Sequence, residues 1–80
     1  MVANYKYLPS DFAGLSTLQN DLQGFYNALE NYQVTHSPLD EINLTEALVD
    51  VHLNLKHRAL FGALSQSKSN EIESYLESLL

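Results

Sequence analysis

The sequence predicts an all-α protein: an antiparallel bundle of three helices with a long central helix, completed by dimerisation. Apolar residues repeat at helical spacing in three stretches, and short breaks containing Pro or Ser separate them. The chain has 80 residues, enough for one small domain with a marginal core of its own, and it has no cysteine for a disulfide. We therefore expect a single helical domain over residues 1–80 that gains stability by association.

The N-terminal residues 1–9 are expected to form an extended arm. Tyr5 and Tyr7 alternate with polar residues, which is a weak strand pattern, but so short a strand needs a partner. The other β-like stretch is 32–36, and pairing between the two is the alternative. We favour an arm whose tyrosines pack on the bundle or on a second subunit.

The first helix is expected over residues 11–33. Ser10 and Asp11 follow Pro9 and form a typical helix start. Large apolar residues then recur in heptad fashion over almost three heptads, which predicts one buried seam. These residues are Leu15, Leu18, Leu22, Phe25, Leu29 and Tyr32, with Phe12 and Tyr26 widening the stripe.

The central helix is expected over residues 38–65. Ser37 is placed as its N-cap and Pro38 as its first residue, with Asp40 and Glu41 in the first turn. A second start signal at Asn43 suggests a short helical turn before the long helix. A helix of about 28 residues would span about 42 Å, which is long for so small a domain and favours a dimer.

Two apolar arcs run along this central helix, and a narrow polar stripe lies beside the second. A helix with two apolar faces is either packed between neighbouring helices or buried in an oligomer. Gly62, on the first arc, is interpreted as a close helix crossing inside the helix. The first arc is Leu44, Leu48, Val51, Leu55 and Ala59; the second is Val49, Leu53, Leu60 and Leu64; the stripe is Glu46, Asp50, Asn54 and His57.

The third helix is expected over residues 69–80, with Ser67 or Ser69 as its N-cap. It ends on Leu79 and Leu80, which we expect to be docked on the core or on a partner because a terminal helical turn otherwise frays. We expect the first and third helices to cover one arc each. The predicted core is Phe12, Leu15, Leu18, Leu22, Phe25, Leu29, Leu44, Leu48, Val51, Leu55, Leu60, Leu64, Ile72, Leu76 and Leu79.

The composition and motifs give no support for catalysis or a cofactor. A net charge of −6 disfavours binding to nucleic acid or to anionic membranes. His52 is interpreted as a half-buried, hydrogen-bonded residue, and it points about 140° away from His57 on a helix, so the two cannot share a metal ion. Glu46, Asp50 and His57 share one stripe and reach a metal only if a dimer brings two copies together. We therefore predict no enzyme activity, no cofactor and no metal.

The sequence favours a small acidic protein–protein interaction module of the regulator, inhibitor, immunity or adaptor type. It would act as a homodimer or on another protein, in the cytoplasm. An acidic nucleic-acid mimic that blocks a DNA- or RNA-binding protein is the alternative, and a helical-bundle metal protein is a more remote one. The candidate interface residues are Tyr5, Tyr7, Tyr26, Val49, Leu53, Leu60, Tyr75, Leu79 and Leu80.

Overall fold

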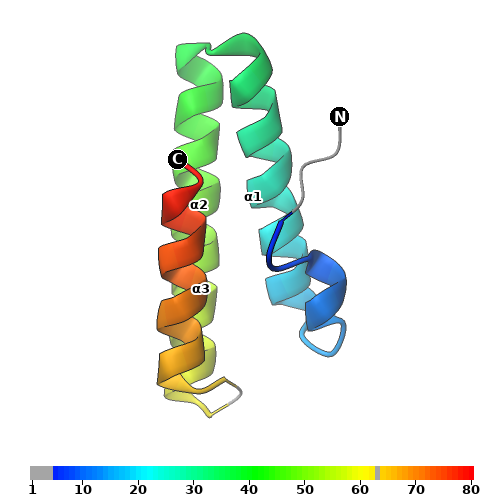
Figure 1. The fold of residues 1–80 in the computed structure, drawn as a ribbon, viewed down its shortest axis with the longest axis vertical. Coiled ribbons are helices and arrows are strands. Elements are labelled where there is room, and N and C mark those ends of the chain that lie inside the picture. Colours follow the sequence, from blue (N-terminus) through cyan, green and yellow to red (C-terminus); the bar gives the residue numbers. More distant parts are fainter. Residues whose placement is uncertain (1–4, 63) are drawn as a thin grey trace.

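A computed structural model describes residues 5–62 and 64–80, and these form three α-helices and one short 3-10 helix. The 3-10 helix η1 spans Pro9–Phe12, α1 spans Ser16–Thr35, α2 spans Pro38–Leu60 and α3 spans Gln66–Ser78. Successive α-helices reverse direction along the long axis of the molecule (Figure 1). The predicted all-α class is confirmed.

The chain enters the first helix later than predicted. A helical turn does form here, and the Asp11 carboxylate stabilises its start by accepting a hydrogen bond from the Leu8 N–H at 2.9 Å. That turn is η1, which ends at Phe12, and a short non-helical segment separates it from α1, which begins at Ser16. Gly14 lies in the break, and glycine disfavours a continuous helix. The predicted start at residue 11 is therefore wrong for α1.

The connection between α1 and α2 is short and well specified. His36 adopts the left-handed conformation (φ 50°) and its N–H donates to the Tyr32 carbonyl, which ends α1. Ser37 caps α2 by accepting a hydrogen bond from the Asp40 N–H at 3.1 Å, and Pro38 opens the helix. This predicted cap is confirmed. The expected separate turn before Asn43 is wrong, since α2 is continuous from Pro38.

Gly62 ends α2 rather than marking a helix crossing. Its φ of 83° lies in the left-handed region, which an L-residue adopts only with strain. The N–H groups of Gly62 and Leu64 turn back to the carbonyls of Ala59 and Arg58 and satisfy part of the last helical turn. The helix therefore has 23 residues instead of the predicted 28, about 35 Å, and the length argument for a dimer is weaker.

The third helix begins at Gln66, and its N-cap is Ser65 rather than Ser67 or Ser69. The Ser65 hydroxyl accepts from the Lys68 N–H at 3.1 Å. Ser69 is instead fully buried. With 13 residues, α3 covers only part of the hairpin that α1 and α2 form, and the C-terminus lies partway along α2 (Figure 1).

The core lies between the three helices, and most of its predicted residues are confirmed. Leu60 is the exception, because its side chain is 79% exposed. Tyr7 and Tyr26, which we had assigned to an interface, belong to the core. The buried apolar residues are Tyr7, Phe12, Leu18, Leu22, Phe25, Tyr26, Leu29, Leu44, Val51, Leu55, Ile72 and Leu76, with Leu15, Leu48, Leu64 and Leu79 partly buried against them.

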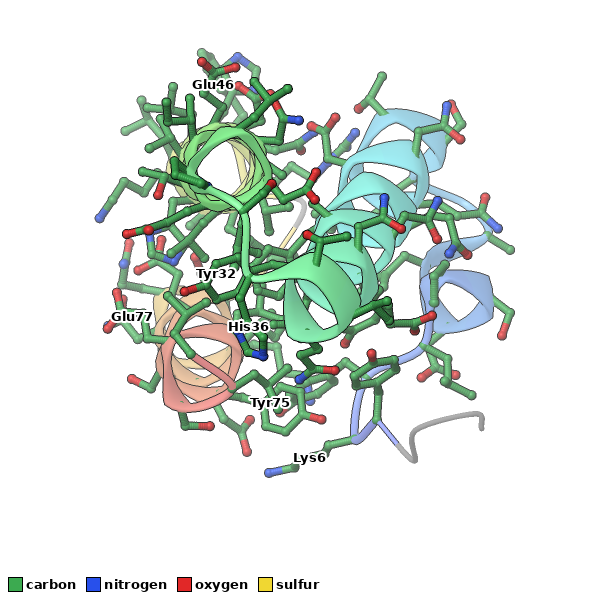
Figure 2. The ribbon with its side chains drawn as sticks, turned by 90° about the horizontal axis from the view of Figure 1, so that it is seen from above. Lys6, Tyr32, His36, Glu46, Tyr75 and Glu77 are labelled. Atoms are coloured by element: carbon green, nitrogen blue, oxygen red, sulfur yellow. The ribbon has the colours of Figure 1, made fainter. Side chains whose placement is uncertain are left out.

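Residues 5–8 of the predicted arm pack on the bundle between α1 and α3, as Figure 2 shows around Lys6 and Tyr75, and residues 1–4 lie outside the described part of the chain. The Tyr26 hydroxyl donates to the Tyr7 carbonyl, and the ring of Tyr5 stacks on that of Tyr26 with centroids 3.8 Å apart. The Lys6 N–H donates to the Tyr75 hydroxyl at 2.7 Å. No strand occurs within 5–62 and 64–80, so the alternative of a strand pairing with 32–36 is not observed for the part of the arm that is described.

Candidate protein-interaction surface

Large apolar side chains line the side of α2 that faces away from the other helices. We call this surface the outer face. It consists of Leu39, Ile42, Val49, Leu53 and Leu60, which are 67%, 55%, 49%, 61% and 79% exposed. Single exposed apolar residues are ordinary, but a row of five on one helix is the kind of patch that marks a contact surface.

The outer face follows from the register of α2. Leu44, Val51 and Leu55 are buried, and at 100° per residue the outer face lies roughly opposite them. Both α1 and α3 pack on the core side, so our expectation that these two helices would cover one arc each is wrong. Leu60 belongs to this opposite side, which is why it is not in the core.

Two charged residues interrupt the outer face at heptad positions. Leu39, Glu46, Leu53 and Leu60 follow one another at intervals of seven, and so do Ile42, Val49 and Lys56. This is the a/d pattern of a helix that packs along a second helix. Figure 2 shows Glu46 on the side of α2 away from α1 and α3.

A polar cluster fixes α2 against α1 on one flank of the outer face. The Asn54 amide nitrogen donates to the Asp21 carboxylate at 2.9 Å, and the Arg58 Nε donates to the Asn54 carbonyl oxygen at 2.8 Å. The Arg58 guanidinium also donates to the Thr17 hydroxyl. These side chains line a shallow depression together with Asp50, Leu53 and His57. Asn54 and Arg58 are hydrogen-bonded to side chains of α1, so this cluster helps to position α2 relative to α1.

Ion pairs connect α2 to α3 on the other flank. His52 Nε2 lies 3.7 Å from a Glu77 carboxylate oxygen, and Lys56 Nζ lies 3.8 Å from one of Glu73. The predicted half-burial of His52 is confirmed, since its side chain is 20% exposed. Within the described residues, its Nε2 has a neighbouring carboxylate but no hydrogen-bond partner, so the predicted hydrogen bond is not confirmed at that atom.

A second hollow lies beyond the end of α3, where the short helix leaves the hairpin uncovered. It has a volume of about 380 Å³ and is lined by Leu29, Tyr32, Leu44, Leu79 and Leu80, among others. Leu79 is partly buried there and Leu80 is 64% exposed. The two terminal leucines therefore lie at the edge of an apolar hollow in their own chain.

The structure divides the predicted interface residues into three groups, of which Leu79 and Leu80 at the hollow are one. Tyr5, Tyr7, Tyr26 and Tyr75 lie together where the arm meets α1 and α3. Val49, Leu53 and Leu60 lie together on the outer face. Leu39 and Ile42 also belong to the outer face but were not among the predicted residues, although Ile42 is seven residues before Val49 and Leu39 is fourteen before Leu53.

Burial sets the electrostatics of the arm. Burial raises the pKa of Tyr5 to about 12, and the Glu30 carboxylate, which accepts a hydrogen bond from the Tyr5 hydroxyl at 2.9 Å, adds to this shift. Burial also raises the pKa of Tyr26. The neighbouring Tyr7 hydroxyl and Lys6 ammonium, with Lys68, lower the pKa of Glu71. Each of these shifts favours the protonation state found at neutral pH.

Among the described residues, no group of three or more His, Asp or Glu side chains is arranged to hold a metal ion. None of the helices α1 to α3, in the part of the chain that is described, combines the length and apolarity needed to cross a membrane. The fold and surface define an all-α helical bundle with one exposed apolar helix face. Comparisons with protein families, curated proteins and solved structures find no match to this chain.

Proposed function

We propose that this protein is a small acidic protein–protein interaction module that acts through the outer face of α2. The observation that carries the proposal is the row of five exposed apolar residues opposite the core. Burying a Leu or Ile side chain is worth about 1.5–3 kcal/mol, so covering this row provides a driving force for association. In this proposal the antiparallel three-helix bundle is completed by a homodimer in the cytoplasm.

The arrangement of charges favours this proposal over a nucleic-acid mimic. A mimic needs a dense array of free carboxylates, whereas two carboxylates of α3 each lie beside a lysine of the same chain. Glu71 lies 3.3 Å from Lys6, and Glu73 lies 3.8 Å from Lys56. Such pairs reduce the negative field that a basic cleft would bind.

The test is the solution mass, measured by light scattering over a concentration series. The full chain is compared with a Val49→Ser/Leu53→Ser variant, and we expect the double substitution to shift association to much higher concentration. Val34→Ser is the matched control, because Val34 is 82% exposed but lies on α1. Association that the double variant retains unchanged would refute a role for the outer face, provided that circular dichroism shows the same helix content.

A further inference from the structure

We infer that the outer face binds the outer face of a second copy of this chain, with the two α2 helices antiparallel and the two-fold axis at the level of Val51. This inference rests on the proposed homodimer and adds the orientation and register of its two α2 helices. In an antiparallel helix pair, an a residue of one helix packs against a d residue of the other. The chain's own heptads show which register matches the layers between Ile42 and Leu60.

The register centred on Val51 matches apolar with apolar and acid with base. Residues that pair across the axis are equally distant from Val51 on opposite sides. Val49 then meets Leu53 of the second copy, and Ile42 meets Leu60. Glu46, five positions before Val51, meets Lys56 of the second copy, five positions after it. Two-fold symmetry forms each of these contacts twice.

Other registers leave charges unmatched. A parallel pair in register places Glu46 beside Glu46 and Lys56 beside Lys56, which repels at both layers. An antiparallel pair shifted by one heptad places Glu46 against Val49, or Lys56 against Leu53, and so buries a charge against an apolar side chain. A polar pair inside an apolar seam is a known means of fixing helix register and orientation.

The size of the surface indicates a weak dimer. A helix face about 35 Å long and about 10 Å wide offers about 350 Å² per copy, or about 700 Å² in total. Stable protein interfaces bury about 1,200–2,000 Å². We therefore expect association that depends on concentration in the micromolar range or above.

One acidic residue opposes this dimer. Asp50 is exposed beside the outer face and lies one position from the axis level, so it approaches Asp50 of the second copy. Like charges in such positions repel. Asp50→Asn should therefore tighten the dimer by a few fold, although the substitution adds no apolar contact.

Distances between spin labels measure the register directly. The chain has no cysteine, so single Asn43→Cys and Asp50→Cys variants carry one label per copy. In the proposed register the Asp50 sites are about 3 Å apart along the helix axes and the Asn43 sites about 24 Å apart, at 1.5 Å per residue. A parallel dimer gives the same short separation at both sites.

Charge exchange tests the Glu46–Lys56 contact. Glu46→Lys and Lys56→Glu should each weaken self-association about tenfold, because both symmetric pairs become repulsive. An equal mixture of the two variants should associate at least as tightly as the unmodified chain, since each altered charge then meets its opposite. Glu41→Lys makes the same charge change away from the outer face and is the matched control.

The outcomes separate this inference from the proposed function. Short separations at both labelled sites, or no recovery in the mixture, overturn the register but leave the outer face as an interface. A monomer at all concentrations overturns both this inference and the homodimer of the proposed function. Association that survives Val49→Ser/Leu53→Ser overturns the proposed function itself. Long Asn43 separations with recovery in the mixture support the inference.

Discussion

Truncating two leucines of α2 that are two residues apart should have very different effects on stability. Leu55 is completely buried, whereas Leu53 is 61% exposed on the outer face. Leu55→Ala removes packed atoms and leaves a cavity, which costs about 2–5 kcal/mol. At about 0.05–0.15 kcal/mol per residue, an 80-residue domain has about 4–12 kcal/mol of unfolding free energy, so this loss is a large part of it. Leu53→Ala should change stability by less than about 0.5 kcal/mol in the monomer.

The assay is urea unfolding followed by circular dichroism, at a protein concentration low enough for the monomer to predominate. Alanine is a good helix former, so neither substitution carries a helix-propensity penalty that would mask the difference. At higher concentration Leu53→Ala should also lose the stability that association contributes. Equal losses for both variants in the monomer would mean that α2 is rotated about its axis relative to the orientation described, and that the outer face is not exposed.

Three further predictions concern helix ends and tyrosines. Ser37→Ala should lower the unfolding free energy by about 1 kcal/mol in urea titrations, because the Asp40 N–H loses its cap. Gly62→Ala should lower the unfolding free energy by about 1–2 kcal/mol through its left-handed φ alone, since no atom lies within 4 Å of the added Cβ. Gly24→Ala, inside α1, should instead raise the unfolding free energy by about 0.4–1 kcal/mol in the same assay. The stability that follows from the raised pKa of Tyr5 should be fully present below the ordinary value near 10 and lost as pH rises through about 12. Because the pKa of Tyr26 is raised as well, tyrosinate absorbance should show one late-titrating group fewer in Tyr5→Phe than in the unmodified chain.

Periodicity predicted the helices and the core well because the buried residues repeat at regular spacing. Leu18, Leu22, Phe25 and Leu29 form such a row, and all four are buried. The caps were less certain, because several serines compete at the start of α3 and only Ser65 has the geometry to accept from a backbone N–H. Gly62 was misread for a similar reason: its conformation decides whether it interrupts a helix, and spacing carries no information about φ.

The candidate site was only partly predictable, since periodicity does not determine which of two apolar arcs faces the core. That choice depends on how α1 and α3 pack, which is a property of the whole fold. The tyrosines of the arm were expected to pack on the bundle or on a second subunit, and spacing does not decide between these two. The hydrogen bond from Tyr26 to the Tyr7 carbonyl joins segments that sequence spacing does not relate.

The contact between the arm and α3 has a consequence for the order of folding. The Lys6 N–H and the Tyr75 hydroxyl are 69 residues apart in the chain, whereas α1 and α2 are joined by a two-residue turn. The entropic cost of closing a loop grows with its length, so the α1–α2 hairpin should form first and the arm should dock last. We expect the contact between residues 5–8 and α3 to open before the hairpin does, and native-state hydrogen exchange should then show the amides of residues 5–8 exchanging at a lower free energy than those of α1 and α2.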